Sequence, residues 1–128
     1  DAHRFVLVCP SFGYGNWEHP DSPMAVQRAV NYALEHFAGI DPARVYLAGL
    51  SQGGAGVGRA AATLPGTFAG LVFLSGTMEP TVLQSEAFAG KRVLVIQGDG
   101  DRHVTLKNVL TGVEALKQAG AGVTVLRD

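Results

Sequence analysis

The residues best suited to chemistry in this chain form the short sequence GLSQG, at positions 49–53. The pattern G-x-S-x-G follows an apolar run at 45–48 and precedes a helical pattern, which is the arrangement of a nucleophile elbow. A serine on such a sharp, strained turn projects its hydroxyl above the sheet. We expect glycine at both 49 and 53 because a Cβ at either position would collide with neighbouring backbone. The pattern therefore predicts that Ser51 is a nucleophile.

A nucleophilic serine needs a base, a carboxylate that orients the base, and N–H donors for the oxyanion. The backbone N–H of Gln52 is a donor by position, because it opens the following helix. A Gly/Asp-rich turn after the apolar run 93–96 supplies two candidate carboxylates, Asp99 and Asp101. This turn lies at the carboxyl edge of a parallel sheet, where catalytic groups gather. The alternative is that both aspartates only stabilise the turn and the next helix.

The base is harder to assign. The four histidines are His3, His19, His36 and His103. In hydrolases with this order of residues, the histidine follows the acid, after the next strand. Here that strand ends near residue 126 and the sequence ends at 128. His103 lies two residues from Asp101 on the same turn, which is a poor position for contacting both Asp101 and Ser51. The histidines show no metal-ligand spacing, so we predict no metal site and no cofactor.

Three further side chains are candidates for contact with a substrate. Tyr14 and Trp17 belong to the loop after the apolar run 5–9, at the expected catalytic edge of the sheet. They are predicted to line an acyl pocket, with hydrophobic packing of the loop as the alternative. Met78 follows another predicted strand and is predicted to lie on the rim of the pocket.

The elements that must position these residues alternate along the chain. Short apolar runs occupy residues 5–8, 45–48, 71–74, 93–96 and 123–126. The first four are nearly continuous, which is typical of parallel strands covered on both faces. Helical patterns lie between them, the first capped by Ser22 with Pro23 in its first turn. The alternation predicts an α/β fold: a parallel sheet with helices on both faces, in one domain over residues 1–128.

Composition narrows the classes of partner. The chain has 128 residues, a net charge of −1 and 47% hydrophobic residues. This balance gives no attraction to nucleic acid or to anionic membranes, and no apolar run approaches the roughly 20 residues of a membrane span. A small neutral substrate and a soluble, cytoplasmic protein are favoured. Cys9, the single cysteine, excludes an internal disulfide and is expected to be buried; it leaves the compartment undecided. Nothing indicates the oligomeric state.

Taken together, these segments resemble the α/β-hydrolase fold, and more narrowly the phospholipase/carboxylesterase group that includes acyl-protein thioesterases. The match is carried by residues 41–54, 68–76, 93–104 and 120–125. The resemblance implies that Ser51 is the nucleophile and Gln52 the oxyanion donor. It also implies that Asp101 is the acid, because Gly98, Asp101 and Val104 fit the family pattern G-x-x-D-x-x-V.

The resemblance further implies that this chain is the middle and later part of a larger hydrolase. The family has a strand between those matching residues 5–9 and 45–48, and the loop after it donates the second oxyanion N–H. The family also has a terminal helix and a catalytic histidine after the last strand. Gln97 stands where the family usually has histidine. A sheet without an interior strand is expected to leave backbone groups unpaired or to form a new pairing.

Three hypotheses about function follow. The first is a serine hydrolase that cleaves carboxylic esters or thioesters through an acyl-enzyme on Ser51. In this hypothesis a histidine beyond residue 128 is the base, and Asp101 orients it. The second is a hydrolase-like module that binds a partner or small molecule without catalysis. The third is nucleotide binding at residues 56–61, which fit G-x-G-x-x-A, although that fingerprint should begin at the end of a strand.

Overall fold

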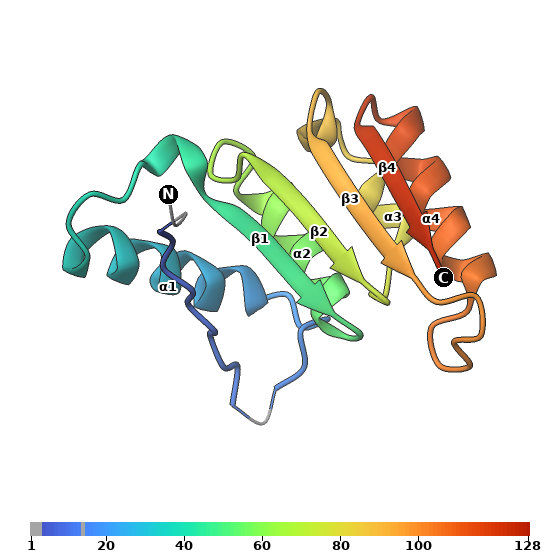
Figure 1. Ribbon diagram of the computed structural model, residues 1–128, viewed down its shortest axis with the longest axis horizontal. Helices are drawn as coiled ribbons and strands as arrows, with labels where there is room; N and C mark the ends of the chain where they lie inside the picture. The colour runs from blue at the N-terminus through green and yellow to red at the C-terminus, as the bar shows by residue number, and fades with distance from the viewer. Residues whose placement is uncertain (1–3, 14) are drawn as a thin grey trace.

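A parallel sheet of four strands forms the centre of the fold (Figure 1). The computed structural model describes residues 4–13 and 15–128. The strands are β1 (Tyr46–Leu50), β2 (Gly70–Leu74), β3 (Arg92–Gln97) and β4 (Gly122–Arg127), and they stand in the sheet in chain order. The helices are α1 (Ser22–His36), α2 (Gly53–Thr63), α3 (Pro80–Leu83) and α4 (Leu106–Gln118), with short 3-10 turns at Pro42–Arg44 and Glu86–Phe88. The predicted α/β class and parallel sheet are confirmed.

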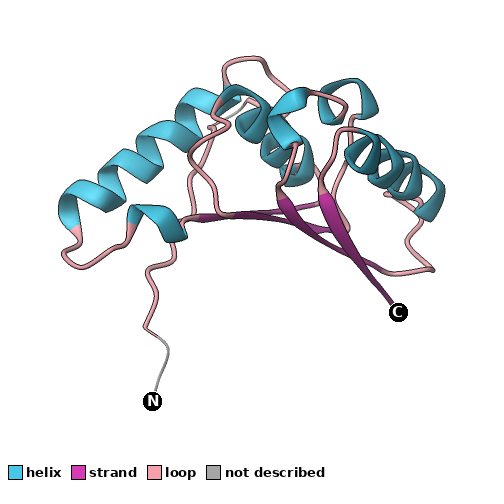
Figure 2. Ribbon diagram, turned by 90° about the horizontal axis from the view of Figure 1, so that it is seen from above, coloured by secondary structure: helices cyan, strands magenta, loops and turns pink. Residues whose placement is uncertain are grey.

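The helices lie on one side of this sheet (Figure 2). Parallel strands that follow one another in chain order, joined by right-handed crossovers, place their connecting helices on the same face. The prediction of helices on both faces is therefore corrected for the described residues. The other face carries apolar side chains in the open, including Tyr46, Leu50 and Leu126, and Leu50 is 67% exposed. Nearly continuous apolar strands thus form a sheet of which only one face is covered in this chain.

The hydrophobic core lies between the covered face and α2 and α4. Leu71 and Phe73 of β2 and Val93 and Val95 of β3 point into it from the sheet and are buried. The helices meet them with apolar side chains that include Val57, Ala60, Val109, Val113 and Leu116. Burial of these groups is the main favourable contribution to folding.

Replacing Phe73, the central side chain of this core, tests how the sheet is stabilised. Phe73 is completely buried, so Phe73→Ala leaves a cavity and should lower the free energy of unfolding by about 3–5 kcal/mol. Urea denaturation followed by circular dichroism measures the change. Leu126→Ala, on the open face, is the control and should change stability by less than about 0.5 kcal/mol. Equal losses in the two variants would contradict this description of the core.

The apolar run at residues 5–9 is not a strand, contrary to the prediction. Its residues lie in an irregular segment, in which Phe5 is 82% exposed. A strand is stable only when its N–H and C=O groups pair with a neighbour, and β1 pairs only with β2 among the described residues. Cys9, which was expected to be buried, is exposed for the same reason.

The first helix differs from the prediction at its N-terminus. Its N-cap is Asp21 rather than Ser22, and Ser22 is instead buried, with its hydroxyl donating a hydrogen bond of 2.9 Å to the Trp17 carbonyl. Pro23 does lie in the first turn, as predicted. Within α1 only Ser22, Pro23 and Val26 are fully buried, because α1 packs mainly against α2 rather than against the sheet.

Candidate active site

Ser51 occupies a strained turn between the end of β1 and the start of α2. Its φ of 52° lies in the left-handed region, which non-glycine residues rarely adopt. The turn is held from the neighbouring strand: the Ser51 N–H donates to the Leu74 carbonyl at 3.1 Å. The Ser51 carbonyl accepts from the N–H groups of Gly54 and Thr77 at 3.0 and 2.8 Å. The strand, sharp turn and helix expected around Ser51 are all present.

The glycines around Ser51 have different roles from those expected. A Cβ on Gly49 would overlap the backbone of Gly53, so glycine is required at 49. A Cβ on Gly53 would meet open space, so the prediction for that position is wrong. The second close approach is at Gly54, where a Cβ would lie 2.7 Å from both the Gly76 Cα and the Thr77 carbonyl oxygen. Gly54 must be glycine and Gly53 need not be, because only Gly54 packs against the loop after β2.

The groups that would contact a reacting molecule are accessible. Ser51 and Gln52 are both exposed, and Gln52 is the N-cap of α2. Within residues 4–13 and 15–128, the Gln52 N–H donates no hydrogen bond to another protein group. This N–H stands at the positive end of the helix dipole, immediately after Ser51. It is therefore free to bind a developing negative charge on a substrate oxygen.

Asp101 lies in the loop at residues 98–104, which follows β3. Its Oδ1 accepts hydrogen bonds from the N–H groups of His103 and Val104, at 2.8 and 3.0 Å. The bond from Val104, then that from His103, holds the pKa of the Asp101 carboxyl below its usual value; the Ser75 hydroxyl lowers this pKa further. Both backbone bonds end on Oδ1, which leaves Oδ2 for a donor outside the loop.

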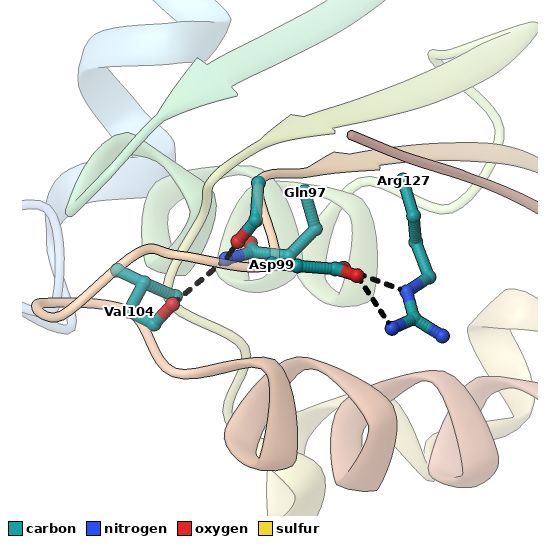
Figure 3. A network of polar contacts seen from close by, with 5 residues as sticks. Gln97, Asp99, Val104 and Arg127 are labelled. Atoms are coloured by element: carbon teal, nitrogen blue, oxygen red, sulfur yellow. Dashed lines mark hydrogen bonds and ion pairs between the residues drawn. The ribbon is translucent and has the colours of Figure 1, made fainter.

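Asp99, the other candidate acid, has a different partner. Its two carboxylate oxygens accept from Nε and Nη2 of Arg127, each at 2.8 Å (Figure 3). The hydrogen bond from Arg127 is the main cause of its lowered pKa. Asp99 therefore ties the loop to the end of β4, on the side away from β2. The two aspartates thus have different surroundings: Arg127 of β4 holds Asp99, whereas the Ser75 hydroxyl after β2 lowers the pKa of Asp101.

That residue, Ser75, is one that sequence reasoning missed. Ser51 and Ser75 are the two non-glycine residues with positive φ in the described part of the chain, and φ of Ser75 is 41°. Its N–H donates to the Ile96 carbonyl at 2.8 Å, so the ends of β2 and β3 are joined. Ser75 thus stands between the turn of Ser51 and the loop of Asp101. The sequence Leu-Ser-Gly at 74–76, directly after an apolar run, was the available signal for Ser75. Its positive φ is a structural sign of the same kind, since strained non-glycine residues cluster at functional sites.

Among the described residues, no histidine side chain makes a hydrogen bond or ion pair with Ser51 or Asp101. His36 stacks on Tyr32 near the end of α1, with ring centroids 3.9 Å apart, and His19 accepts a hydrogen bond from the Asp21 N–H. His103 is exposed. The base thus remains unassigned, and a histidine beyond residue 128 stays a prediction.

The predicted substrate-contact residues fall in different places. Tyr14 lies outside the described residues. Trp17 is half-buried and covers the first turns of α2, where a Cβ on Gly56 would lie 3.0 Å from its ring; its centroid is 5.7 Å from that of Phe12. Trp17 therefore packs within its loop and also lies beside the helix that follows Ser51. Met78 is buried against Gly112 of α4, and this packing favours a core role over the predicted place on a pocket rim.

The nucleotide-binding hypothesis does not fit the fold. Residues 56–61 lie inside α2 rather than at the turn before it. Gly56 is in contact with Trp17, and a Cβ on Gly58 would lie 3.2 Å from Leu83 of α3. These glycines allow close packing of side chains against α2 and do not form a phosphate-binding turn.

No group of three or more His, Cys, Asp or Glu side chains in residues 4–13 and 15–128 could hold a metal ion. None of the helices in the described part of the chain combines the length and apolar character needed to cross a membrane.

Comparison with known proteins relates this chain to hydrolases through its structure. Neither a family model nor a curated protein matches the sequence. A thermostable esterase is similar at a TM-score of 0.69 and 26% identity, over 82% of this chain and 28% of that chain. SOBER1 of Arabidopsis thaliana is similar at 0.64 and 26% identity, over 83% of this chain and 53% of its own. Esterase PE8, at 0.67 and 22% identity, shares the fold over 93% of this chain and 58% of its own.

The chain thus spans between 28% and 58% of these three structures. This chain contributes four parallel strands in chain order, with helices between them. The chain therefore has a partial α/β-hydrolase fold, and its structure is similar to those of two esterases and of SOBER1.

Proposed function

We propose that this chain carries the nucleophile and the acid of a serine hydrolase that cleaves carboxylic esters or thioesters. The observation that supports this most strongly is the left-handed Ser51, at φ 52°, directly before the free N–H of Gln52. Strain at a serine that opens a helix has no structural benefit of its own, whereas it exposes the hydroxyl above the strand ends. The similarity to a thermostable esterase at 26% identity supports the same class of reaction.

In the proposed reaction, the Ser51 Oγ attacks the acyl carbon while its proton passes to a histidine base, which we place beyond residue 128. The carbonyl oxygen becomes an oxyanion and accepts a hydrogen bond from the Gln52 N–H. Asp101 holds the histidine through Oδ2 and stabilises its positive charge. The intermediate then collapses: the C–O or C–S bond breaks, and the alcohol or thiol leaves with the proton from the histidine. Water attacks the acyl-enzyme with the same base, and the acid is released.

We also propose that the substrate is a small molecule bound near Trp17. The half-buried ring lies beside the first turns of α2, next to the turn that presents Ser51. An apolar wall in that position suits the hydrocarbon part of an acyl group. Tyr14 belongs to the same loop in the sequence and is proposed to share this wall.

Labelling with a fluorophosphonate tests the nucleophile directly. This reagent forms a phosphonyl ester with an activated serine, and peptide mass spectrometry locates the adduct. The longest expressed chain that contains residues 1–128 should be labelled on Ser51, and prior incubation with an ester substrate should reduce the labelling. A well-folded, histidine-containing chain that is labelled at a residue other than Ser51, or not labelled at all, would contradict the enzyme hypothesis. That result would favour the alternative, a binding module without catalysis.

A further inference from the structure

The side chain of Gln97 is the polar group in this structure that most needs an explanation beyond the proposed reaction. Gln97 is the last residue of β3 and is only 1% exposed. Burial of a carboxamide is costly unless its donors and acceptors find partners. The Gln97 amide lies against the loop at residues 98–104, which carries Asp101.

One nitrogen of Gln97 connects the two ends of that loop (Figure 3). Its Nε2 donates to the Val104 carbonyl at 2.8 Å and to the Gly98 carbonyl at 3.1 Å. A primary amide has two N–H groups on one nitrogen, so it can satisfy both acceptors at once. The side chain therefore closes the loop from inside, where water does not compete for the same carbonyl groups.

Both residues that Gln97 contacts are also bonded to Asp101. The Asp101 N–H donates to the Gly98 carbonyl at 3.2 Å, and the Val104 N–H donates to Asp101 Oδ1 at 3.0 Å. A displacement of either end would therefore move the carboxylate. The loop is held on its outer side by Asp99, through Arg127 and through a 2.8 Å bond from the Asp99 N–H to the Asp128 carbonyl.

The orientation of the Gln97 amide indicates which of its atoms matters. Its Oε1 is buried and has no hydrogen-bond partner within the described ranges. The reversed amide would place this oxygen against the carbonyl oxygens of Gly98 and Val104 and would leave both without a donor. An unpaired buried acceptor is destabilising, and the two bonds donated by Nε2 offset that loss. The donors of Gln97 are therefore the functional part of the side chain.

We propose that Gln97 is a positioning residue for the catalytic acid: its buried amide closes the 98–104 loop and so fixes the place and hydrogen bonding of Asp101. This inference rests on the proposed role of Asp101. In it, Gln97 holds the loop at residues 98–104 and does not contact the substrate. It also explains why a neutral side chain with two donors on one atom stands at the end of β3.

Gln97→Glu tests the inference because it keeps the shape of the side chain and removes both donors. Two NMR measurements on the 128-residue chain report on the loop: the carboxyl ¹³C titration of Asp101 and amide hydrogen exchange. At pH 7, exchange at the His103 and Val104 N–H groups should become about tenfold faster, as expected for the loss of one hydrogen bond. The pKa of Asp101 should rise toward the ordinary aspartate value of about 3.9.

The same variant should respond to pH in a way the parent chain does not. The introduced carboxyl faces two carbonyl oxygens in a buried site, so its own pKa is raised. Once protonated it can donate to Val104, and the exchange rates at 103 and 104 should return toward those of the parent. Asp101 titrates at lower pH, so the two events are separable.

Gln97→Met keeps the test decisive if the charged variant does not fold. It removes the donors together with the unpaired Oε1, so it should fold, yet it should show the same faster exchange and raised Asp101 pKa. Gln118→Glu, an exposed change on α4, is the matched control and should alter neither quantity. The Asp99 N–H, which bonds to Asp128, should keep its exchange rate in every variant.

Unchanged exchange and an unchanged Asp101 pKa in Gln97→Met would overturn the inference. A uniform increase at all amides, including Asp99, would also overturn it, because it indicates a loss of global stability only. These measurements do not depend on activity. Absence of fluorophosphonate labelling at Ser51 would therefore count against the proposed function while the contacts of Gln97 could still be tested.

Discussion

Ser51→Ala is expected to lower ester hydrolysis by a factor of about 10⁶ in kcat, the scale seen when the nucleophile of a serine hydrolase is removed. The reason is that no other side chain in the described structure occupies a strained turn directly before a free helix N–H. The rate is measured with a chromogenic ester in the longest expressed chain that contains residues 1–128 and shows activity. Ser85→Ala, a change at the 3-10 turn of Glu86–Phe88, is the control and should retain the parent rate.

The strain at Ser51 adds a second readout that does not involve the substrate. Alanine has the same unfavourable left-handed φ as serine, so Ser51→Ala should leave stability nearly unchanged. Glycine adopts φ of 52° without a steric penalty, so Ser51→Gly should be more stable than Ser51→Ala by about 1 kcal/mol. Urea denaturation measures this difference. Hydrolysis that persists in both variants would show that Ser51 is not the nucleophile, whatever their stability.

Asp101→Asn should lower kcat by about 10⁴, while Asp99→Asn should change it less than tenfold. The first factor is that of a triad whose acid is replaced by its amide, because the histidine is then held in the wrong tautomer. The second variant loses only the exposed pair with Arg127, and exposed ion pairs contribute little to stability. Each variant replaces a carboxylate by an amide, and the two positions are two residues apart on one loop, so each serves as the control for the other.

The comparison of these two variants also distinguishes the catalytic from the structural interpretation of the loop. If both aspartates only stabilised the turn, the variants would lose thermal stability together and keep similar rates. A larger loss of rate in Asp99→Asn than in Asp101→Asn would show that Asp99, and not Asp101, is the catalytic acid. Melting temperature and kcat should therefore be measured on the same samples.

The parallel strands and the strained turn at Ser51 could be predicted because both depend on local patterns. Four of the five apolar runs became strands with the expected parallel pairing. Gly49 was required because the turn itself folds back on its own backbone. The Gly54 contact, by contrast, is made with the loop after β2, more than 20 residues away in the chain, and no local pattern describes that approach.

The run at residues 5–9 shows where such patterns fail. Its side chains are as apolar as those of β3, but its backbone has no neighbouring strand to pair with among the described residues. The hydrophobic pattern indicates which segments can form strands, whereas the pairing itself requires a neighbouring strand with free backbone N–H and C=O groups. The same reasoning applies to the helices, whose common face follows from the strand order and the hand of the crossovers.

The sequence by itself determined the α/β class, the strained serine between β1 and α2, and the loop of two aspartates after β3, because each is encoded in residues adjacent in the chain. Only the tertiary structure showed that the two aspartates have different partners: Arg127 of β4 holds Asp99, whereas the Ser75 hydroxyl after β2 lowers the pKa of Asp101. Only the tertiary structure also revealed that the buried amide of Gln97 donates to both ends of the loop at residues 98–104. Contacts between strand ends depend on the register of the sheet, and that register is set by packing over the whole core rather than by any single segment.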